Sequence, residues 1–312
     1  MTDQIVKQAL ALWDMEDAAH RLVTARENAV YEVVLGERRA ALRLHRLGYR
    51  TDAELQSELD WMATVAAGGL STPSPIPISQ GDLLRHIGDR QVDMLTWLDG
   101  DVMADVLAAS DSTARRSLFR QLGHDMARLH IISDKWTPPD GFVRAKWDRD
   151  GLLGETPLWD RFWENPACRA EDTALFCAFR RQALDRLADI GPTLDYGLIH
   201  ADLVPANVLV DGNALRLIDY DDGGYGFRLF DIATALLKLR TAADYPALQD
   251  ALIKGYQAVR PLDLAELNLF LALRAATYVG WNIARAAEPG AAERNDRFLT
   301  DLRVQARTWM DE

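Results

Sequence analysis

The sequence contains few cysteines and no long run of apolar residues. Only two of its 312 residues are cysteines, Cys168 and Cys177, so a framework of several disulfides and a four-cysteine zinc site are excluded. The most apolar late stretch, residues 267–281, is interrupted by Arg274 and is shorter than the roughly 20 residues of a membrane-spanning helix. The N-terminus has acidic residues where a secretion signal would have basic ones, so we expect a helix there and a cytoplasmic protein.

Basic residues are also outnumbered by acidic ones. The chain has 35 Lys and Arg against 47 Asp and Glu, a net charge of −12. Such a balance repels nucleic-acid phosphates and anionic lipids unless basic residues form a local patch, and no such patch is visible. We therefore expect neither a nucleic acid nor a membrane as a partner. An apolar fraction of 48% is typical of a folded globular protein.

The first hundred residues combine short strands with one amphipathic helix. Residues 20–45 alternate in the manner of three antiparallel strands joined by polar turns. A helix follows, capped by Thr51 or Asp52 and ended by the glycines at 68 and 69. Residues 83–87 and 92–98 are short, apolar runs and predict two more strands. This part of the chain is therefore expected to form a small antiparallel β layer with one helix.

The rest of the chain is predicted to be mainly helical, with one β island at residues 196–226. Within the island, residues 208–210 and 214–218 read as two strands, because Asp211-Gly212 between them is a strong hairpin signal. The final third returns to amphipathic helices. The fold class is therefore α+β, with a β-rich domain at residues 1–98 and a mainly helical domain at residues 99–312.

Polar residues gather at the strand ends of the β island. His200, Asp202 and Asn207 share one loop, and Asp219 ends the strand that pairs back beside it. Carboxylate and amide oxygens are ligands that Mg²⁺ accepts together with substrate phosphates, which suits Asn207 and Asp219. Asp202 is then left near the metal, where a carboxylate can accept the proton of an attacking hydroxyl. The loop therefore predicts a phosphoryl-transfer site.

The segments LIHADLVPANVLV and LIDYDDGGYGFRLFDIATAL resemble the catalytic core of the protein-kinase-like fold, as found in aminoglycoside and choline phosphotransferases. They are especially similar to the branch that contains homoserine kinase, hydroxylysine kinase and stress response kinase A. The resemblance implies a two-lobed fold with ATP and Mg²⁺ as cofactors. It implies that Asp202 is the catalytic base, that Asn207 and Asp219 hold Mg²⁺, and that His200 supports the backbone of the loop.

The resemblance extends to the first hundred residues, which it identifies as a nucleotide-binding lobe, with the catalytic and acceptor-binding lobe after residue 98. Protein kinases use a Gly-rich loop, a strand Lys on the phosphates and a helix Glu paired with that Lys. Here the loop TARENAVYEV has no GxGxxG, but Asn28 stands where small-molecule kinases commonly have an Asn. The third strand supplies Arg43 in place of the Lys, and Glu58 is its expected partner.

A hinge between the two lobes is expected at residues 94–100, MLTWLDG. The resemblance implies that backbone groups of this segment contact the edge of the adenine ring, which makes Leu95 and Trp97 candidate nucleotide contacts. Later residues are candidates for the acceptor pocket: Tyr225, Arg228, Trp281 and Arg285.

Three questions stay open at this point. The expected acceptor is the hydroxyl of a small molecule, of the amino alcohol, hydroxy amino acid or aminoglycoside type, and the alternative is a Ser/Thr protein kinase similar to stress response kinase A. Arginine and lysine are not interchangeable, so Arg43 leaves a nucleotide-binding pseudokinase as a further alternative. The protein is expected to be a monomer or a homodimer. A dehalogenase-type phosphatase or a glycosyltransferase, suggested by the DxD in IDYDD, is disfavoured because no βα alternation follows Asp219.

Overall fold

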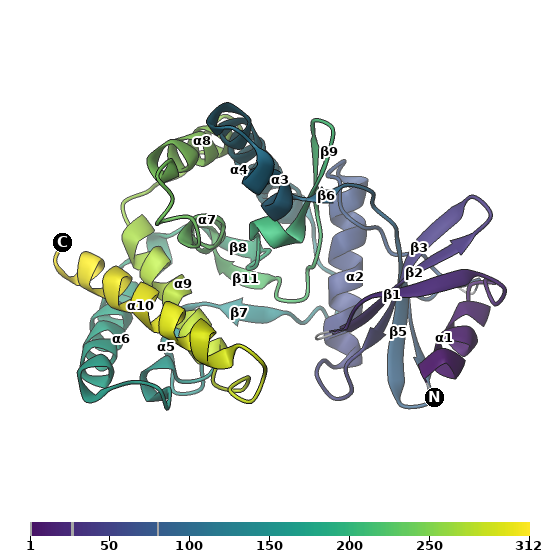
Figure 1. The fold of residues 1–312 in the computed structure, drawn as a ribbon, viewed down its shortest axis with the longest axis horizontal. Coiled ribbons are helices and arrows are strands. Elements are labelled where there is room, and N and C mark those ends of the chain that lie inside the picture. The colour runs from purple at the N-terminus through teal and green to yellow at the C-terminus, as the bar shows by residue number, and fades with distance from the viewer. Residues whose placement is uncertain (1, 26–27, 80) are drawn as a thin grey trace. The chain divides into compact units, whose positions relative to one another are not determined.

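The computed structural model describes residues 2–25, 28–79 and 81–312, whose contacts group into two compact units (Figure 1). The first unit comprises residues 1–106, 135–144 and 208–221, and the second comprises residues 107–134, 145–207 and 222–312. The first unit thus takes in three segments, 99–106, 135–144 and 208–221, that the division predicted at residue 98 assigns to the second domain. The chain enters the first unit directly after Asn207 and leaves it after Asp221.

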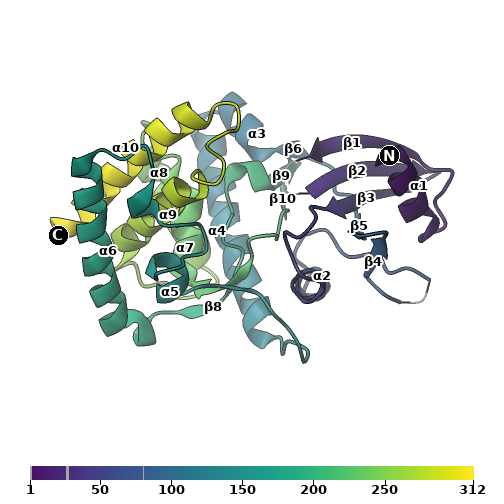
Figure 2. The same cartoon turned by 90° about the horizontal axis from the view of Figure 1, so that it is seen from below.

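The first unit is built on an antiparallel five-stranded sheet in the order β1-β2-β3-β5-β4 (Figure 2). The predicted meander and the two later strands are confirmed. A small second sheet, in the order β10-β9-β6, contains the predicted hairpin, whose turn has Gly212 at φ +58°. The elements of this unit are α1 (Thr2–Ala11), β1 (Ala19–Ala25), β2 (Asn28–Leu35), β3 (Arg38–His45), α2 (Asp52–Ala67), β4 (Leu84–Ile87), β5 (Arg90–Thr96), β6 (Asp101–Val102), β9 (Val208–Asp211) and β10 (Ala214–Leu217).

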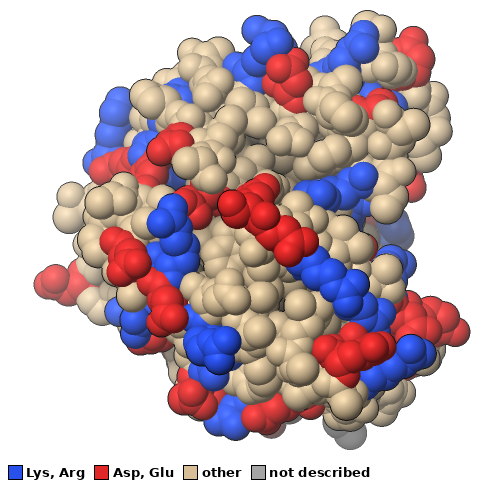
Figure 3. Space-filling model, turned by 90° about the vertical axis from the view of Figure 1, so that its left-hand side faces the viewer, with Lys and Arg blue, Asp and Glu red and all other residues tan. Residues whose placement is uncertain are grey.

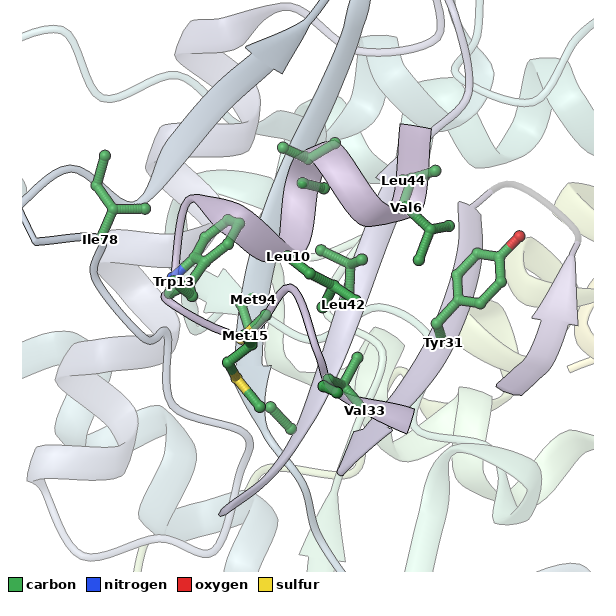
Figure 4. Close-up of a cluster of buried hydrophobic side chains, with 14 residues drawn as sticks. Val6, Leu10, Trp13, Met15, Tyr31, Val33, Leu42, Leu44, Ile78 and Met94 are labelled. Carbon is green, nitrogen blue, oxygen red and sulfur yellow. The ribbon is translucent and has the colours of Figure 1, made fainter. Parts of the chain in front are cut away.

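The two faces of this sheet are covered differently, and the alternation of β3 decides which residues lie on which face. Successive side chains of a strand point to opposite faces. Ala40, Leu42 and Leu44 therefore share one face, which α1 and the turn after it cover. Figure 4 shows the apolar cluster that results, which includes Val6, Leu10, Trp13, Met15, Tyr31, Val33, Leu42, Leu44, Ile78 and Met94. Arg43 and His45 lie on the opposite face, with α2.

Helix α2 begins and ends where the sequence predicts. Thr51 is its N-cap and forms a capping box with Glu54, because the Thr51 hydroxyl accepts from the Glu54 N–H and the Glu54 carboxylate accepts from the Thr51 N–H at 2.9 Å. The helix stops at Gly68, and Gly69 takes a φ of +82°. This fixed start and end set the position of Glu58 in the second turn, where its side chain is buried.

The second unit is mainly helical, as expected, and also contains a three-stranded sheet in the order β7-β11-β8. Its elements are α4 (Ser112–Lys135), β7 (Ala145–Trp147), α5 (Arg149–Leu153), α6 (Ala170–Ile190), β8 (Tyr196–Ile199), β11 (Gly224–Phe227), α7 (Arg228–Leu237), α8 (Tyr245–Gln257), α9 (Leu267–Trp281) and α10 (Ala291–Met310). The division of the chain after residue 106 falls within α3 (Met103–Ala109). On the face shown in Figure 3, basic side chains are interspersed with acidic ones. No described helix has the length and apolar character needed to cross a membrane.

Strand β11 was not predicted, because its sequence GYGF follows Asp221-Asp222-Gly223 and reads as a turn. A Cβ on Gly224 would lie 2.3 Å from the Ala145 carbonyl oxygen, and one on Gly226 would lie 2.4 Å from Ile199 Cδ1. Glycine is required here because the neighbouring strands β7 and β8 approach so closely. Tertiary packing, and not local propensity, makes this segment a strand.

Candidate active site

Three of the predicted nucleotide-site residues lie in one hydrogen-bonded network of the first unit. The strand register places Asn28 opposite His45, and Arg43 opposite Asp93. His45 Nδ1 lies 3.0 Å from Asn28 Oδ1, and His45 Nε2 lies 2.6 Å from Asp93 Oδ2. Arg43 then joins this strand network to Glu58 on α2. The register of the sheet therefore assembles the site on the α2 face.

Arg43 is clamped between two buried carboxylates. Its Nε and Nη2 donate to the two oxygens of Asp93 at 2.8 and 2.9 Å, and its Nη1 donates to Glu58 at 2.7 Å. The predicted partnership with Glu58 is thus present, and Asp93 is a partner that the sequence interpretation missed. A guanidinium has five N–H donors, and these bonds use three of them, so two remain.

Charge pairing outweighs burial in setting the pKa of Arg43, Asp93 and Glu58. Burial alone would lower the pKa of Arg43, but the negative charges of Asp93 and Glu58 raise it. Burial would raise the pKa of Asp93, but Arg43 and His45 bring it down to about 2. The pKa of Glu58 is lowered in the same way, against burial, by Arg43 and Arg144. All these side chains are therefore held in their charged forms at neutral pH.

A second arginine connects this cluster to the segment that follows Asp219. Arg144 Nη1 donates to Glu58 at 3.3 Å, while its Nη2 donates to the carbonyl oxygens of Tyr220 and Asp221 at 2.7 and 2.8 Å. Asp219 itself is exposed and takes a left-handed φ of +69°, a conformation that Asp tolerates better than most residues. Burial and the charge of Glu58 raise the pKa of Asp221. Arg144 thus fixes the backbone beside one predicted metal ligand.

The predicted hinge residues lie at the end of β5. Leu95 is buried and pairs with Ala41 in the sheet, and Trp97 follows the strand with the Arg39 guanidinium 4.7 Å above its ring. Their contact with adenine stays a prediction. Of the expected phosphate loop TARENAVYEV, Arg26 and Glu27 lie outside the described residues, whereas Asn28 begins β2.

In the second unit, the predicted loop brings Asp202 and Asn207 together. Asn207 Nδ2 donates to Asp202 Oδ2 at 2.7 Å and to the Asp202 carbonyl oxygen at 3.0 Å. The amide group of Asn207 therefore presents its other polar atom, Oδ1, as a potential ligand. The Asp202 N–H points to Nδ1 of the buried His200 at 3.4 Å, in agreement with the expected supporting role of that histidine.

Asp231, in the first turn of α7, holds the backbone of this loop. Its carboxylate accepts from the N–H groups of His200 and Ala201 at 2.9 and 2.7 Å. Ala201 has a φ of +64°, which costs an alanine of order 1 kcal/mol. His130 contacts Asp231 through Nε2 at 3.0 Å, and burial lowers its pKa to about 4. A buried carboxylate thus stabilises a strained backbone directly before Asp202.

Arg274 on α9 also reaches Asp202. Its Nη2 donates to Asp202 Oδ1 at 2.6 Å, so the two oxygens of this carboxylate are held by different partners. The sequence signal for this residue was a single charge inside an apolar helix. Of the predicted acceptor residues, Arg228 is fully buried in ion pairs with Asp134, and Arg285 stacks 4.1 Å from the Trp281 ring. Tyr225 is half-buried on β11, paired with Leu198.

Comparison with known proteins assigns the family. Residues 20–270 match the phosphotransferase enzyme family, also called APH. The chain belongs to this family. The enzyme class predicted from the motif, a phosphotransferase, is therefore confirmed at the level of the family. The family match spans the predicted nucleotide-site residues in the first unit and the loop of Asp202 in the second.

Relatives of this APH protein include kinases of small molecules. It is 34% identical over 280 residues to an uncharacterized protein of Deinococcus radiodurans, covering 84% of this chain and 76% of the other. It is 30% identical to a homoserine kinase of Rhizobium rhizogenes over 67% of this chain, and the match spans 61% of that kinase. A solved structure of a microcompartment-associated aminopropanol kinase is 29% identical, with a TM-score of 0.85 over 99% of this chain and 97% of that one. The predicted protein-kinase-like fold is confirmed.

Proposed function

We propose that this protein transfers the γ-phosphoryl group of ATP to the hydroxyl of a small molecule in an Mg²⁺-dependent reaction. The observation that carries the proposal is a hydrogen bond on the loop after β8, in which Asn207 Nδ2 donates to Asp202 Oδ2 at 2.7 Å. This bond orients both side chains at once. It leaves Asn207 Oδ1 as a potential metal ligand and directs Asp202 as the acceptor of a proton.

The residues present fit a Mg²⁺ ion that is shared with a nucleotide. Mg²⁺ is commonly bound through one or two protein groups, with phosphate oxygens and water completing six ligands. Among the residues that the structure describes, no group of three or more His, Cys, Asp or Glu is placed to hold a metal ion. A site that depends on phosphates needs no such group. Asn207 and Asp219 would hold the ion, because one amide and one carboxylate are the two protein groups that such an ion takes.

The chemistry needs little covalent help from the protein. The acceptor oxygen bonds to the γ-phosphorus, the bond from that phosphorus to the β–γ bridging oxygen breaks, and ADP leaves. Asp202 orients the hydroxyl and takes its proton. When bound, Mg²⁺ would neutralise charge on the β and γ phosphates. Arg43, held by Glu58 and Asp93, has two N–H donors left for phosphate oxygens, and Asn28, Leu95 and Trp97 would contact the rest of the nucleotide.

The acceptor class that we favour is a small amino alcohol or hydroxy amino acid. The aminopropanol kinase matches nearly the whole chain, and seven homoserine kinases match at 28–32% identity, although the matches span only 61–64% of their length. Both names denote compounds with a hydroxyl and an amine. An aminoglycoside or a protein serine is the alternative acceptor that the experiment must separate.

The first test is ADP release from Mg²⁺-ATP with a panel of amino alcohols, hydroxy amino acids, aminoglycosides and a generic protein, with a no-acceptor control. We expect release with one of the first two classes. Asp202→Ala should lower kcat by about 10³-fold or more while nucleotide still binds. Asp219→Ala should instead weaken Mg²⁺-dependent nucleotide binding, as measured by calorimetry with and without the metal.

The matched control is Asp211→Ala, which removes an exposed carboxylate at the end of β9 that is ion-paired with Arg216, and it should change neither kcat nor nucleotide binding. Near-normal turnover by Asp202→Ala would contradict the role of that residue. Nucleotide binding without turnover on any acceptor would favour a pseudokinase, and release that requires the protein acceptor would favour a Ser/Thr protein kinase.

A further inference from the structure

Arg274 is a buried charge in the middle of an apolar helix. Helix α9 is almost wholly apolar around it, and the residue is only 2% exposed. Moving a guanidinium out of water costs several kcal/mol unless its partners compensate. Replacing a buried charge by an apolar residue such as leucine is often neutral or stabilising. An arginine at this position therefore indicates a role other than stability. The contacts of its side chain indicate that purpose.

The guanidinium is fixed from three sides. Its plane stacks on the Tyr278 ring, with Cζ 4.2 Å from the ring centre, and lies 5.4 Å from the Phe230 ring centre. Nη2 donates to Tyr278 Oη at 3.1 Å as well as to Asp202 Oδ1 at 2.6 Å. Two aromatic rings and a phenol oxygen therefore set the place from which Nη2 reaches Asp202, and this place does not depend on Asp202 itself.

The Asp202 carboxylate is held at both oxygens by donors from different elements. Asn207, on the same loop, donates to Oδ2, and Arg274, on α9, donates to Oδ1. One donor leaves a carboxylate able to turn about its Cβ–Cγ bond, whereas two donors at separate oxygens fix the plane. Each carboxylate oxygen has two lone-pair directions, so a direction remains at each for an acceptor hydroxyl.

We propose that Arg274 is a positioning residue, which fixes the plane of the Asp202 carboxylate so that one lone pair faces the acceptor hydroxyl. This inference rests on the proposed function of Asp202. Arg274 also places its positive charge beside the carboxylate that is to take the hydroxyl proton. Burial alone would lower the pKa of Arg274, but the interactions with Tyr278 and Asp202 raise it, and a guanidinium stays charged in proteins.

The test compares Arg274→Gln with Arg274→Lys at saturating substrates. Misplacing a reacting group by about 1 Å costs up to about 10²-fold in rate, so we expect Arg274→Gln to lower kcat roughly 30-fold. The KM for Mg²⁺-ATP should stay within about 2-fold, because Arg274 touches no predicted nucleotide residue. Arg274→Lys keeps the cation but has no fork, and should lose about 5-fold in kcat.

A double variant distinguishes positioning from general damage. If Arg274 acts through Asp202, Arg274→Gln should have no further effect on kcat in an Asp202→Ala background. The matched control is Arg303→Gln in the same unit. Arg303 also holds a carboxylate, that of the buried Asp172, through two hydrogen bonds, and its removal should leave kcat unchanged. Thermal unfolding of each variant shows whether it is folded at the assay temperature.

Several results would overturn the inference. Wild-type kcat in Arg274→Gln, a multiplicative loss in the double variant, or an equal loss in Arg303→Gln would each exclude a positioning role. Should Arg274→Gln fail to fold, Arg274→Lys decides alone, and wild-type kcat in that variant would count against the inference. If Asp202→Ala itself retains turnover, then the proposed function fails first, which keeps the two failures distinguishable.

Discussion

At the scale of single residues, Arg43 departs from the family pattern described above and has a second carboxylate partner beside the expected one. The usual lysine would need one carboxylate partner, whereas Arg43 has Glu58 and, across the strand pair, Asp93. The fork of a guanidinium meets Asp93 at two atoms, which an ammonium cannot do. Asp93 is fully buried, so its charge depends on these bonds. Arg43 and Asp93 are therefore best understood as one unit.

We predict that restoring the usual lysine is harmful. Arg43→Lys should lower kcat/KM for Mg²⁺-ATP by about 10-fold and destabilise the fold by roughly 2 kcal/mol, because Asp93 loses a bidentate partner. Adding Asp93→Asn should recover part of the stability, since the carboxylate charge is then gone. Denaturant unfolding and steady-state kinetics of the single and double variants give the coupling free energy between the two sites.

The control for this pair is Arg46→Lys, because Arg46 is exposed directly after β3 and makes no contact with Asp93 that would be lost. It should change stability by no more than about 0.5 kcal/mol. An Arg43→Lys variant as active and as stable as the parent would mean that Asp93 does not need the fork, and that the arginine is a neutral replacement.

At the scale of elements, two glycines let helices α4 and α8 approach closely. A Cβ on Gly123 would lie 2.0 Å from the Leu252 carbonyl oxygen, and one on Gly255 would lie 1.9 Å from the Arg120 carbonyl oxygen. Helix propensity alone favours alanine over glycine by about 1 kcal/mol. Overpacking against a backbone oxygen costs about 1–3 kcal/mol and more when neither helix can move. The steric effect should therefore win.

We predict that Gly123→Ala destabilises the protein by about 2 kcal/mol, although propensity alone predicts the opposite sign. Gly191→Ala is the control, because its Cβ would meet only Phe227 Cζ at an ordinary 3.9 Å. Chemical denaturation of both variants measures the difference. Stabilisation by Gly123→Ala would show that the two helices separate at little cost.

The elements that the sequence predicts are those with a local signal. The helix at residues 52–67 has its cap and its stop in the sequence, and the hairpin at residues 208–217 has Asp-Gly at its turn. Strand β11 has no such signal, because its glycines are required by contacts with strands that are distant in the sequence.

The site residues differ in the same way. Spacing predicts Asp202 and Asn207, which share a loop, whereas Asp93, Arg144 and Arg274 are seen only as charges in apolar surroundings, and no local pattern shows which partners they meet.

At the scale of the whole molecule, each unit contains a buried polar network beside predicted site residues. In the first unit it runs from Asn28 through His45, Asp93 and Arg43 to Glu58. In the second it joins His130 to Asp231 and the backbone of the loop before Asp202. Such networks stabilise only while every member keeps its protonation state. The stability of the molecule should therefore depend on pH through these groups.

The dependence on His130 can be given a sign and a range. Its pKa is lowered from 6.5 to about 4, first by burial and then by the charge of Arg228. Below pH 6.5 His130 is protonated in the unfolded chain, whereas in the folded chain it is protonated only near pH 4. The free energy of unfolding therefore falls as the pH is lowered through this window. The loss amounts to about 3 kcal/mol at pH 4. Asp93, whose pKa is lowered to about 2, adds a loss mainly below its unfolded value of 3.8.

We predict that His130→Gln flattens the stability profile between pH 6.5 and pH 4, because glutamine cannot be protonated in the unfolded chain. The amide can still contact Tyr256 and Asp231, the two partners of the histidine. The variant should be less stable than the parent at pH 7, but the difference should shrink by about 3 kcal/mol on acidification to pH 4. Urea unfolding at half-unit pH steps measures both profiles, and parallel profiles would mean that His130 titrates alike in the folded and unfolded chains.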